Sequence, residues 1–209
     1  DWSSDVCSSD LATYSGGRLV HASGFALGGQ HITMDLARGI GACIADAERI
    51  KTLYGTVLTG GSDSRELMSV PTAGDDRETP QIVSRATIAN IVRHRAEEIF
   101  EMIRDRLADS PFAAEPRARV VLSGGASQLT GTVELATRIL NRQVRIGRPL
   151  GFGRLPNEAK GASFSVPTGL LVYPQYAHLE HVEPRRTRQL RTGTDGYFGK
   201  VGRWLREGF

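Results

Sequence analysis

A glycine-rich turn follows a short apolar run near residue 120, and its residue types suit the binding of a nucleotide or another anion. Val120 to Leu122 is typical of a buried strand, Ser-Gly-Gly-Ala at 123–126 ends it, and a helical apolar period begins at Thr132. Glycines let a ligand approach the backbone, and a helix N-terminus offers unpaired N–H groups. Many such turns carry paired glycines for steric reasons alone, so Gly124, Gly125 and Ala126 are candidates only.

A second glycine turn, Gly28-Gly29, precedes a predicted helix that contains Met34, Leu36 and Ile40. Thr33 is the expected N-cap of this helix, because a threonine hydroxyl can accept from the first free N–H groups. His31 stands alone among other residue types, and we expect it to face solvent or to cap the helix.

Glu48 and Lys51 are the third group of candidate residues. They lie three residues apart on a predicted helix that begins near Ile44 and ends at Gly55, so they share one face. The same spacing is common in solvated surface pairs, and the pair taken alone favours that plainer interpretation.

The elements that must position these residues alternate between strands and helices, which predicts an α/β fold. Gly16-Gly17 predicts a hairpin turn between two strands. Further strands are expected at 67–71, 81–84 and 143–147, with a charged hairpin tip at 75–78. An amphipathic helix is expected from Thr87 to Leu107, and another helix near Thr168 to Tyr173.

Composition limits the function classes. The chain has 209 residues, a net charge of +3 and 40% hydrophobic residues, with no apolar run long enough to span a membrane as a helix. Residues 183–209 carry seven Lys/Arg against three Asp/Glu, so the rest of the chain is close to neutral, which argues against nucleic-acid binding. The two cysteines, Cys7 and Cys43, lack metal-ligand or redox spacing, so we expect a reducing, cytoplasmic setting.

The C-terminal segment 196–209 has the pattern of an amphipathic membrane anchor. On a helical projection its apolar side chains fall on one arc, and its cations fall on the opposite side. The residues expected to contact the membrane are Tyr197, Phe198, Lys200, Val201, Arg203, Trp204, Leu205, Arg206 and Phe209. A helix that docks on the protein itself or on a partner is the alternative. The preceding arginine-rich residues 179–195 predict a disordered linker.

Residues 1–11 differ from the rest of the chain, because they are rich in serine and aspartate and have no periodicity. They resemble a translated sequencing adapter, so we expect a non-native peptide here and a natural sequence from about Ala12. A disordered natural terminus is the alternative.

Several of these segments together, in order and spacing, resemble the C-terminal half of the FtsA family of actin-like bacterial division proteins. The resemblance covers Ala12 to Phe209 and rests on Leu27 to Ala37, Ala47 to Lys51, Val121 to Ser127, Val144 to Gly147 and the Trp-Leu-Arg near the terminal Phe. It implies the second lobe of an actin-like (ribonuclease H-like) fold. Subdomain IIA would comprise 12–42 and 117–178, and subdomain IIB would comprise 43–116.

The resemblance also implies a nucleotide site made by Gly28, Gly29, Glu48, Lys51, Gly124, Gly125 and Ala126, with Glu48 and Lys51 at the ribose and adenine. The cofactor of the full-length family is ATP with Mg²⁺. The phosphate loops of the family have no match here, so the resemblance implies half a site, no assigned catalytic residue or metal ligand, and no ATP hydrolysis by this chain.

The partners implied by the family are the C-terminal peptide of FtsZ, other divisome proteins, further copies in actin-like filaments, and anionic lipid at the cytoplasmic face of the inner membrane at the septum. Arg85 and Arg93, taken as exposed on the long helix, are the candidates to meet the FtsZ peptide. An actin-like kinase or chaperone lobe, and a peripheral membrane protein without nucleotide, are the alternatives. Neither kinase nor chaperone needs the terminal amphipathic helix.

Overall fold

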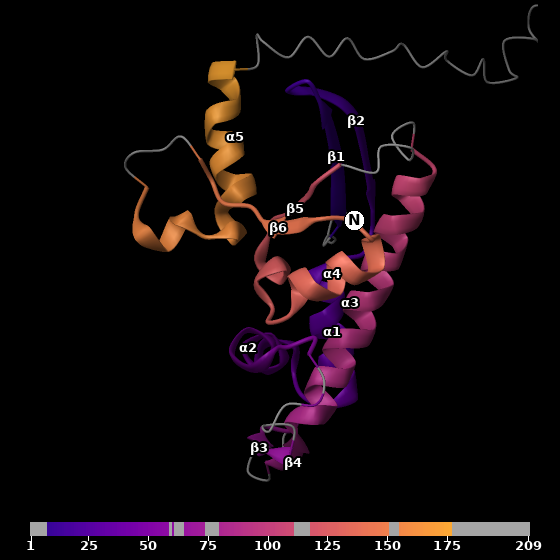
Figure 1. Cartoon of the computed structure of the whole chain (residues 1–209). Coiled ribbons are helices and arrows are strands. Elements are labelled where there is room, and N and C mark those ends of the chain that lie inside the picture. Colours follow the sequence, from indigo (N-terminus) through magenta and orange to yellow (C-terminus); the bar gives the residue numbers. More distant parts are fainter. Residues whose placement is uncertain are drawn as a thin grey trace, which may run out of the picture. The chain divides into compact units, whose positions relative to one another are not determined.

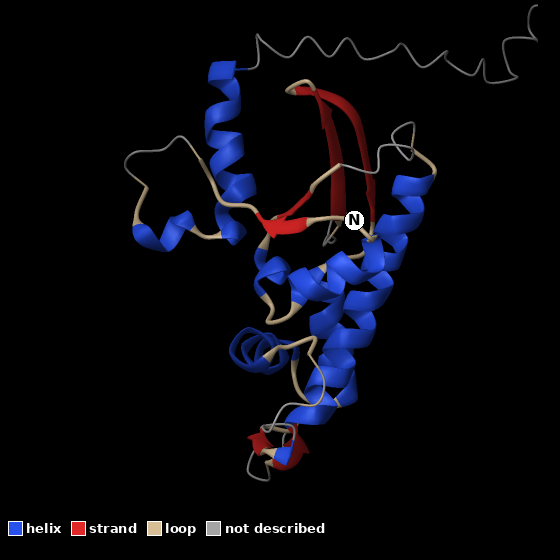
Figure 2. Ribbon diagram, viewed as in Figure 1, coloured by secondary structure: helices blue, strands red, loops and turns tan. Residues whose placement is uncertain are grey.

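The computed structural model describes residues 8–58, 60, 65–73, 80–110, 118–150 and 155–176. The chain divides into two units, Asp1–Tyr173 and Pro174–Phe209, and all described elements belong to the first unit except the last three residues of helix α5. Helices and strands both occur along the first unit, as Figure 2 shows by colour, so the expected α/β class is confirmed. The linker 179–195 and the segment 196–209 lie outside the described residues.

An antiparallel hairpin opens the described chain. Strands β1 (Ser9–Ser15) and β2 (Arg18–Phe25) are joined by Gly16 and Gly17, whose φ angles of 57° and 79° fit the tight hairpin turn predicted from the paired glycines. The strand begins earlier than expected: residues 9–11, placed in the non-native peptide, pair with residues 23–25 of β2. A strand ladder uses backbone groups only, so a serine- and aspartate-rich segment can join it. The origin of residues 1–11 stays a prediction.

Three helices form the main core of this unit. Helix α1 (Gly29–Gly39), helix α3 (Arg85–Ala108) and helix α4 (Thr132–Leu140) pack side by side (Figure 1). Their inward residues are fully or almost fully buried, and they include Ile32, Leu36, Ile88, Val92, Leu135 and Ala136. Burial of one such large side chain contributes roughly 1.5–3 kcal/mol, so this contact holds the N-terminus of α1 in place.

Strands β5 (Val120–Leu122) and β6 (Val144–Ile146) are parallel and are connected through α4. The expected strand and helix are therefore present, but a 3₁₀ turn, η2 (Gly125–Gln128), separates β5 from α4. Gly131, with a φ of 85°, redirects the chain into α4. The glycine turn therefore belongs to η2 and does not open α4 directly.

The other expected elements are also present. Helix α2 (Ile44–Tyr54) ends at Gly55, and β3 (Leu67–Val70) pairs antiparallel with β4 (Gln81–Ser84). The charged tip predicted at 75–78 between these strands lies outside the described residues. Two 3₁₀ turns, η3 (Asn157–Lys160) and η4 (Ala162–Phe164), precede α5 (Ser165–Tyr176).

Helix α5 begins three residues before the expected start at Thr168. Pro167 is its third residue, and a proline is tolerated there because the first-turn N–H groups have no partner within a helix. The division into subdomains IIA and IIB stays a prediction.

Candidate functional site

Helix α1 begins directly at the second glycine turn. Gly28 is the N-cap, its N–H donates to Nδ1 of His31 at 3.2 Å, and the His31 N–H donates to the Gly28 carbonyl at 2.9 Å. The capping role expected for His31 is therefore confirmed. The prediction of Thr33 as N-cap is wrong, since Thr33 lies in the second turn of α1 with no exposed surface. The imidazole of His31, at the third position of the helix, accepts from the N–H of the N-cap, as a glutamate side chain does in a capping box, so the helix begins at Gly28-Gly29 and not at Thr33.

Lys51 connects helix α2 to the first turns of α1. Its side chain is only 10% exposed, and its Nζ donates to Glu48 Oε2 at 2.6 Å, to Thr33 Oγ1 at 2.8 Å and to the Gly29 carbonyl at 3.2 Å. An ammonium has three donors, so the lysine is saturated by the fold. The interpretation of Glu48 and Lys51 as a solvated surface pair is therefore wrong for Lys51, because the partners that bury it come from a helix the sequence spacing does not reveal.

Glu48 is the outward member of this network. Its side chain is 46% exposed, and its Oε2 accepts from both Lys51 and Thr33. Desolvation alone would raise the pKa of the Glu48 carboxyl, but the hydrogen bonds from Lys51 and Thr33, with the charge of Lys51, outweigh it and hold this pKa below its ordinary value. Glu48 is therefore a charged acceptor that a ligand can reach.

The lowered pKa of Glu48 predicts how stability changes with pH. A carboxyl with a lower pKa in the folded state stabilises the protein above its unfolded pKa, and this contribution disappears as the pH falls through the folded value. We expect the wild type to lose stability relative to Glu48→Gln as the pH falls below 4.5. Urea unfolding of both proteins from pH 7 to pH 3 measures this. A difference that stays constant over the whole range would contradict it.

The η2 turn places the third group of candidates beside α1. An ideal Cβ at Gly29 would lie 2.9 Å from the Ala126 Cβ, so the missing side chain of Gly29 is what lets α1 and η2 approach so closely. Gly124 has a φ of 91°, which glycine adopts without strain, and its carbonyl accepts from the hydroxyl of the buried Ser127 at 2.7 Å. The Gly124 N–H donates to the Ala162 carbonyl of η4 at 3.0 Å.

Gly29 is thus the meeting point of the candidate residues. Its carbonyl accepts from Lys51 of α2, and its Cα side faces Ala126 of η2. Ideal Cβ atoms at Gly124 and Gly125 would meet nothing within 4 Å, so the backbone there borders open space that a flat ligand could approach. A carboxylate acceptor beside a glycine wall suits a sugar hydroxyl next to a base, which fits the adenosine part of a nucleotide. Among the described residues, no group of three His, Cys, Asp or Glu could hold a metal ion.

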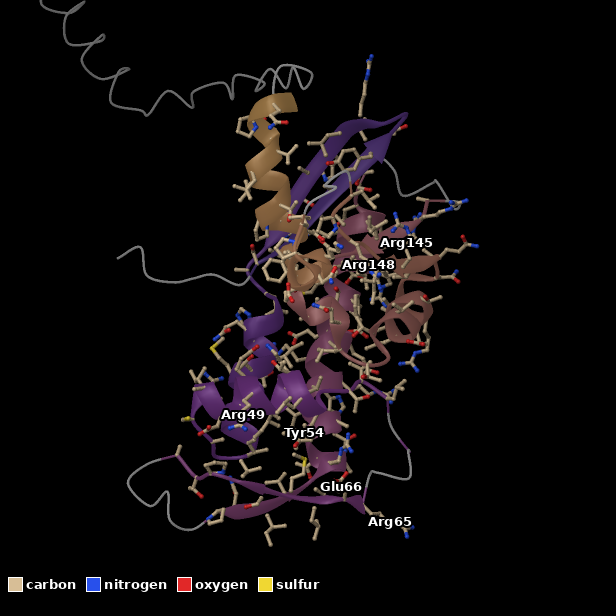
Figure 3. All side chains as sticks on the ribbon, turned by 90° about the vertical axis from the view of Figure 1, so that its left-hand side faces the viewer. Arg49, Tyr54, Arg65, Glu66, Arg145 and Arg148 are labelled. Carbon is tan, nitrogen blue, oxygen red and sulfur yellow. The ribbon has the colours of Figure 1, made fainter. Side chains whose placement is uncertain are left out.

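The candidate peptide-binding arginines lie outside this corner and are less exposed than expected. Arg85 pairs with Glu66 at 2.8 Å and lies over the ring of Tyr54 at 5.7 Å, and Figure 3 labels both partners. Arg93 pairs with Glu97 at 2.8 Å. The side chains of the two arginines are 27% and 26% exposed, so the expectation of two exposed arginines is wrong. Helical periodicity places Glu97 one turn from Arg93, but it could not reveal Glu66, which covers Arg85 from another segment.

Two functional contacts escaped the sequence reasoning. The sequence predicts Thr33 as a cap, but its hydroxyl belongs to the Glu48 network. The sequence predicts Ser127 only as part of the turn, but its hydroxyl donates to the Gly124 carbonyl. The position of Ser127, three residues after a glycine at a turn, was the available signal for the second contact. The nine residues expected to contact a membrane lie outside the described residues.

Comparison with protein families gives one match that covers most of the chain. The model of the family described as "Cell division protein FtsA" matches residues 7–169. The Cell division protein FtsA of Rhizobium meliloti (strain 1021) is 48% identical over 200 residues, covering 95% of this chain and 45% of that protein. The protein of the same description from Escherichia coli (strain K12) is 30% identical over 207 residues, covering 96% of this chain and 49% of that protein. The chain spans about half the length of these relatives.

Solved structures give the same fold. MreB5 of Spiroplasma citri bound to ADP matches with a TM-score of 0.62 at 15% identity, over 81% of this chain and 51% of that chain. A PilM–PilN type IV pilus biogenesis complex contains a chain that matches with a TM-score of 0.55 at 21% identity, over 79% of this chain and 42% of that chain. These similarities establish an actin-like fold, as expected from the sequence.

Proposed function

The chain belongs to the FtsA family of cell division proteins, and from that premise we propose that it is part of an adaptor that attaches FtsZ filaments to the cytoplasmic face of the inner membrane at the septum. In this proposal the actin-like body binds nucleotide and self-associates, and segment 196–209 binds lipid. The observation that carries the proposal is the family match over residues 7–169, followed in the sequence by an amphipathic segment. Other divisome proteins are further proposed partners.

The corner formed by α1, α2 and η2 supports the nucleotide part of the proposal. Glu48 offers a charged, half-exposed carboxylate, and Gly124 and Gly125 leave the backbone open beside it. We assign the ribose to Glu48 and the adenine to the glycine wall of 124–126, with Lys51 holding Glu48 and the Gly28-Gly29 turn in place. In the full-length protein the nucleotide would be ATP with Mg²⁺.

The pattern of residues 196–209 supports the membrane part. Its aromatic and aliphatic side chains share one helical arc, and three cations lie opposite. Each cation near an anionic leaflet contributes about 1 kcal/mol, and partial burial of the apolar side chains adds to this. Such a segment binds a membrane reversibly. Within the described part of the chain, no helix is both long and apolar enough to span a membrane.

Removal of residues 196–209 tests the membrane proposal directly. We expect the full chain to co-sediment with vesicles that contain anionic lipid at modest salt, and the shortened chain to stay in the supernatant. Equal sedimentation of the two chains would refute the anchor.

A matched pair of substitutions separates the apolar face from charge. Val201→Glu places a carboxylate in the apolar arc, and Gly199→Glu places the same charge within the polar arc, between Arg206 and Arg203 on the helical projection. Both variants add one negative charge to the segment. We expect Val201→Glu to bind roughly tenfold more weakly than Gly199→Glu, because burial of a large apolar side chain is worth roughly 1.5–3 kcal/mol. Equal binding of the two variants would mean that charge alone attaches the segment.

For FtsZ we propose the surface at the N-terminal half of α3. Arg85 and Arg93 would meet acidic groups of the FtsZ C-terminal peptide, in exchange for their present partners Glu66 and Glu97. Such an exchange keeps each guanidinium paired. The ion pairs therefore add little to the affinity for the peptide, and their main effect is to orient the bound peptide. Binding of the peptide to Arg85→Ala, compared with Arg104→Ala near the other end of α3, tests this assignment.

A further inference from the structure

The hydroxyl of Thr33 lies at the centre of the Glu48 network, although no ligand could touch it directly. Thr33 is fully buried in α1, Glu48 lies fifteen residues further on in α2, and Lys51 contacts both. We propose that Thr33 is a positioning residue that orients the Glu48 carboxylate and thereby makes the site select a ribose over a sugar without the 2′ and 3′ hydroxyls. This inference rests on the proposed nucleotide binding and deepens it.

The geometry assigns the single hydroxyl proton of Thr33. Its Oγ1 lies 2.5 Å from Glu48 Oε2 and 3.3 Å from the Gly29 carbonyl, and the shorter contact has the charged acceptor. The same oxygen accepts from the Lys51 ammonium at 2.8 Å. Thr33 therefore donates to Glu48 while its own lone pair is held by Lys51, and this arrangement fixes the direction of the hydroxyl.

The hydrogen bonds to Glu48 leave one of its two carboxylate oxygens available to a ligand. In the described part of the chain, the hydrogen bonds from Thr33 and Lys51 both reach Oε2, and none reaches Oε1. The carboxylate is thus held from the protein side at Oε2, and Oε1 keeps its capacity to accept hydrogen bonds on a side chain that is half exposed. A fixed acceptor can take one or two hydroxyls of a vicinal diol without first losing rotamer freedom.

Such a site should bind a nucleotide with a ribose more tightly than one whose sugar lacks the 2′ and 3′ hydroxyls. When a pocket built to accept from a hydroxyl receives an analogue without it, the acceptor is left unpaired, so the analogue binds more weakly. A carboxylate that can rotate into solvent avoids this penalty and discriminates less. Loss of the Thr33 hydroxyl should therefore reduce the preference for ribose and not only the affinity.

The test uses the full 209-residue chain with ADP and 2′,3′-dideoxy-ADP as probes, titrated by NMR. We expect the wild type to prefer ADP by about tenfold, because the half-exposed carboxylate can bind water in place of the missing hydroxyls and so loses only part of the hydrogen-bond energy. Thr33→Val keeps the shape and removes the hydroxyl, and its preference should fall to about twofold or less, whereas Thr33→Ser should restore it. The preference is a ratio within one variant, so a general loss of stability cancels. Should Thr33→Val fail to fold, Thr33→Ala provides the same comparison.

A second readout is the ¹³C titration of the Glu48 carboxyl, whose pKa should rise in Thr33→Val because one stabilising hydrogen bond is lost. If the wild type binds ADP with a sugar preference and Thr33→Val keeps that preference, the inference about Thr33 is overturned while nucleotide binding stands. If the wild type binds neither probe, the proposed nucleotide site fails and this inference fails with it.

Discussion

Replacement of Gly55 by alanine is expected to lower the free energy of unfolding by about 3 kcal/mol, at the upper end of the cost of overpacking. An ideal Cβ at Gly55 would lie 2.2 Å from the Lys51 carbonyl oxygen and 2.6 Å from Leu129 Cδ2. The first contact is with backbone, so no rotamer change relieves it. The Gly55 N–H also donates to that same carbonyl at 2.9 Å, and the clash must break this bond at the end of α2.

Gly55→Ala should also disturb the candidate site, because Gly55 lies where α2 meets the segment between η2 and α4. Two residues further on, the Val57 N–H donates to the Thr130 carbonyl at 2.9 Å. A shift of this junction moves Lys51 and η2 apart. We therefore expect Gly55→Ala to weaken ADP binding as well as stability.

Urea unfolding with Gly169→Ala as the control measures the stability effect. An ideal Cβ at Gly169 meets nothing within 4 Å, and the residue lies inside helix α5, so alanine there should be neutral or stabilise by roughly 0.5–1 kcal/mol. Two variants that unfold at the same urea concentration would show that the space around Gly55 adapts without cost.

The part of the fold that the sequence predicts correctly is local. The Gly16-Gly17 hairpin, the end of α2 at Gly55 and the long helix α3 each follow from turn chemistry or from a period of 3.6 residues within one segment. The strands β5 and β6 and the helix α4 between them are also predicted as elements, whereas the parallel pairing of the two strands is seen only in the structure. The predicted features need no knowledge of what lies opposite in space.

The predictions that fail concern side chains whose exposure depends on contacts between segments distant in the sequence. The burial of Lys51 depends on Gly29 and Thr33 from another helix, and spacing along α2 gives no sign of it. Arg85 is covered by Glu66, nineteen residues earlier, so a helical projection leaves it exposed. The resemblance to a family predicts a nucleotide site at Glu48 and Lys51, where spacing alone favours a surface pair. It could not tell that the lysine serves the fold while the glutamate faces outward.

Replacement of Lys51 by methionine is the second large effect that we expect, with a loss of about 2–3 kcal/mol in the free energy of unfolding. Methionine fills the buried space but offers no donor. The Gly29 carbonyl and the Thr33 hydroxyl lose their donor, and the Glu48 carboxylate loses its counter-charge. Because the Glu48 side chain is half exposed, water compensates part of the lost charge pair, so the cost stays below that of a fully buried pair.

Arg49→Met is the matched control, since it removes one cation from the exposed neighbouring position on α2 (Figure 3) and should change stability by less than about 0.5 kcal/mol. The double variant Glu48→Gln with Lys51→Met distinguishes the origin of the loss. If the unpaired carboxylate causes part of it, the double variant should be more stable than the sum of the two single losses predicts. Strict additivity would instead assign the whole role of Lys51 to Gly29 and Thr33, and would mean that α1 and α2 are held together without help from the charge of Glu48.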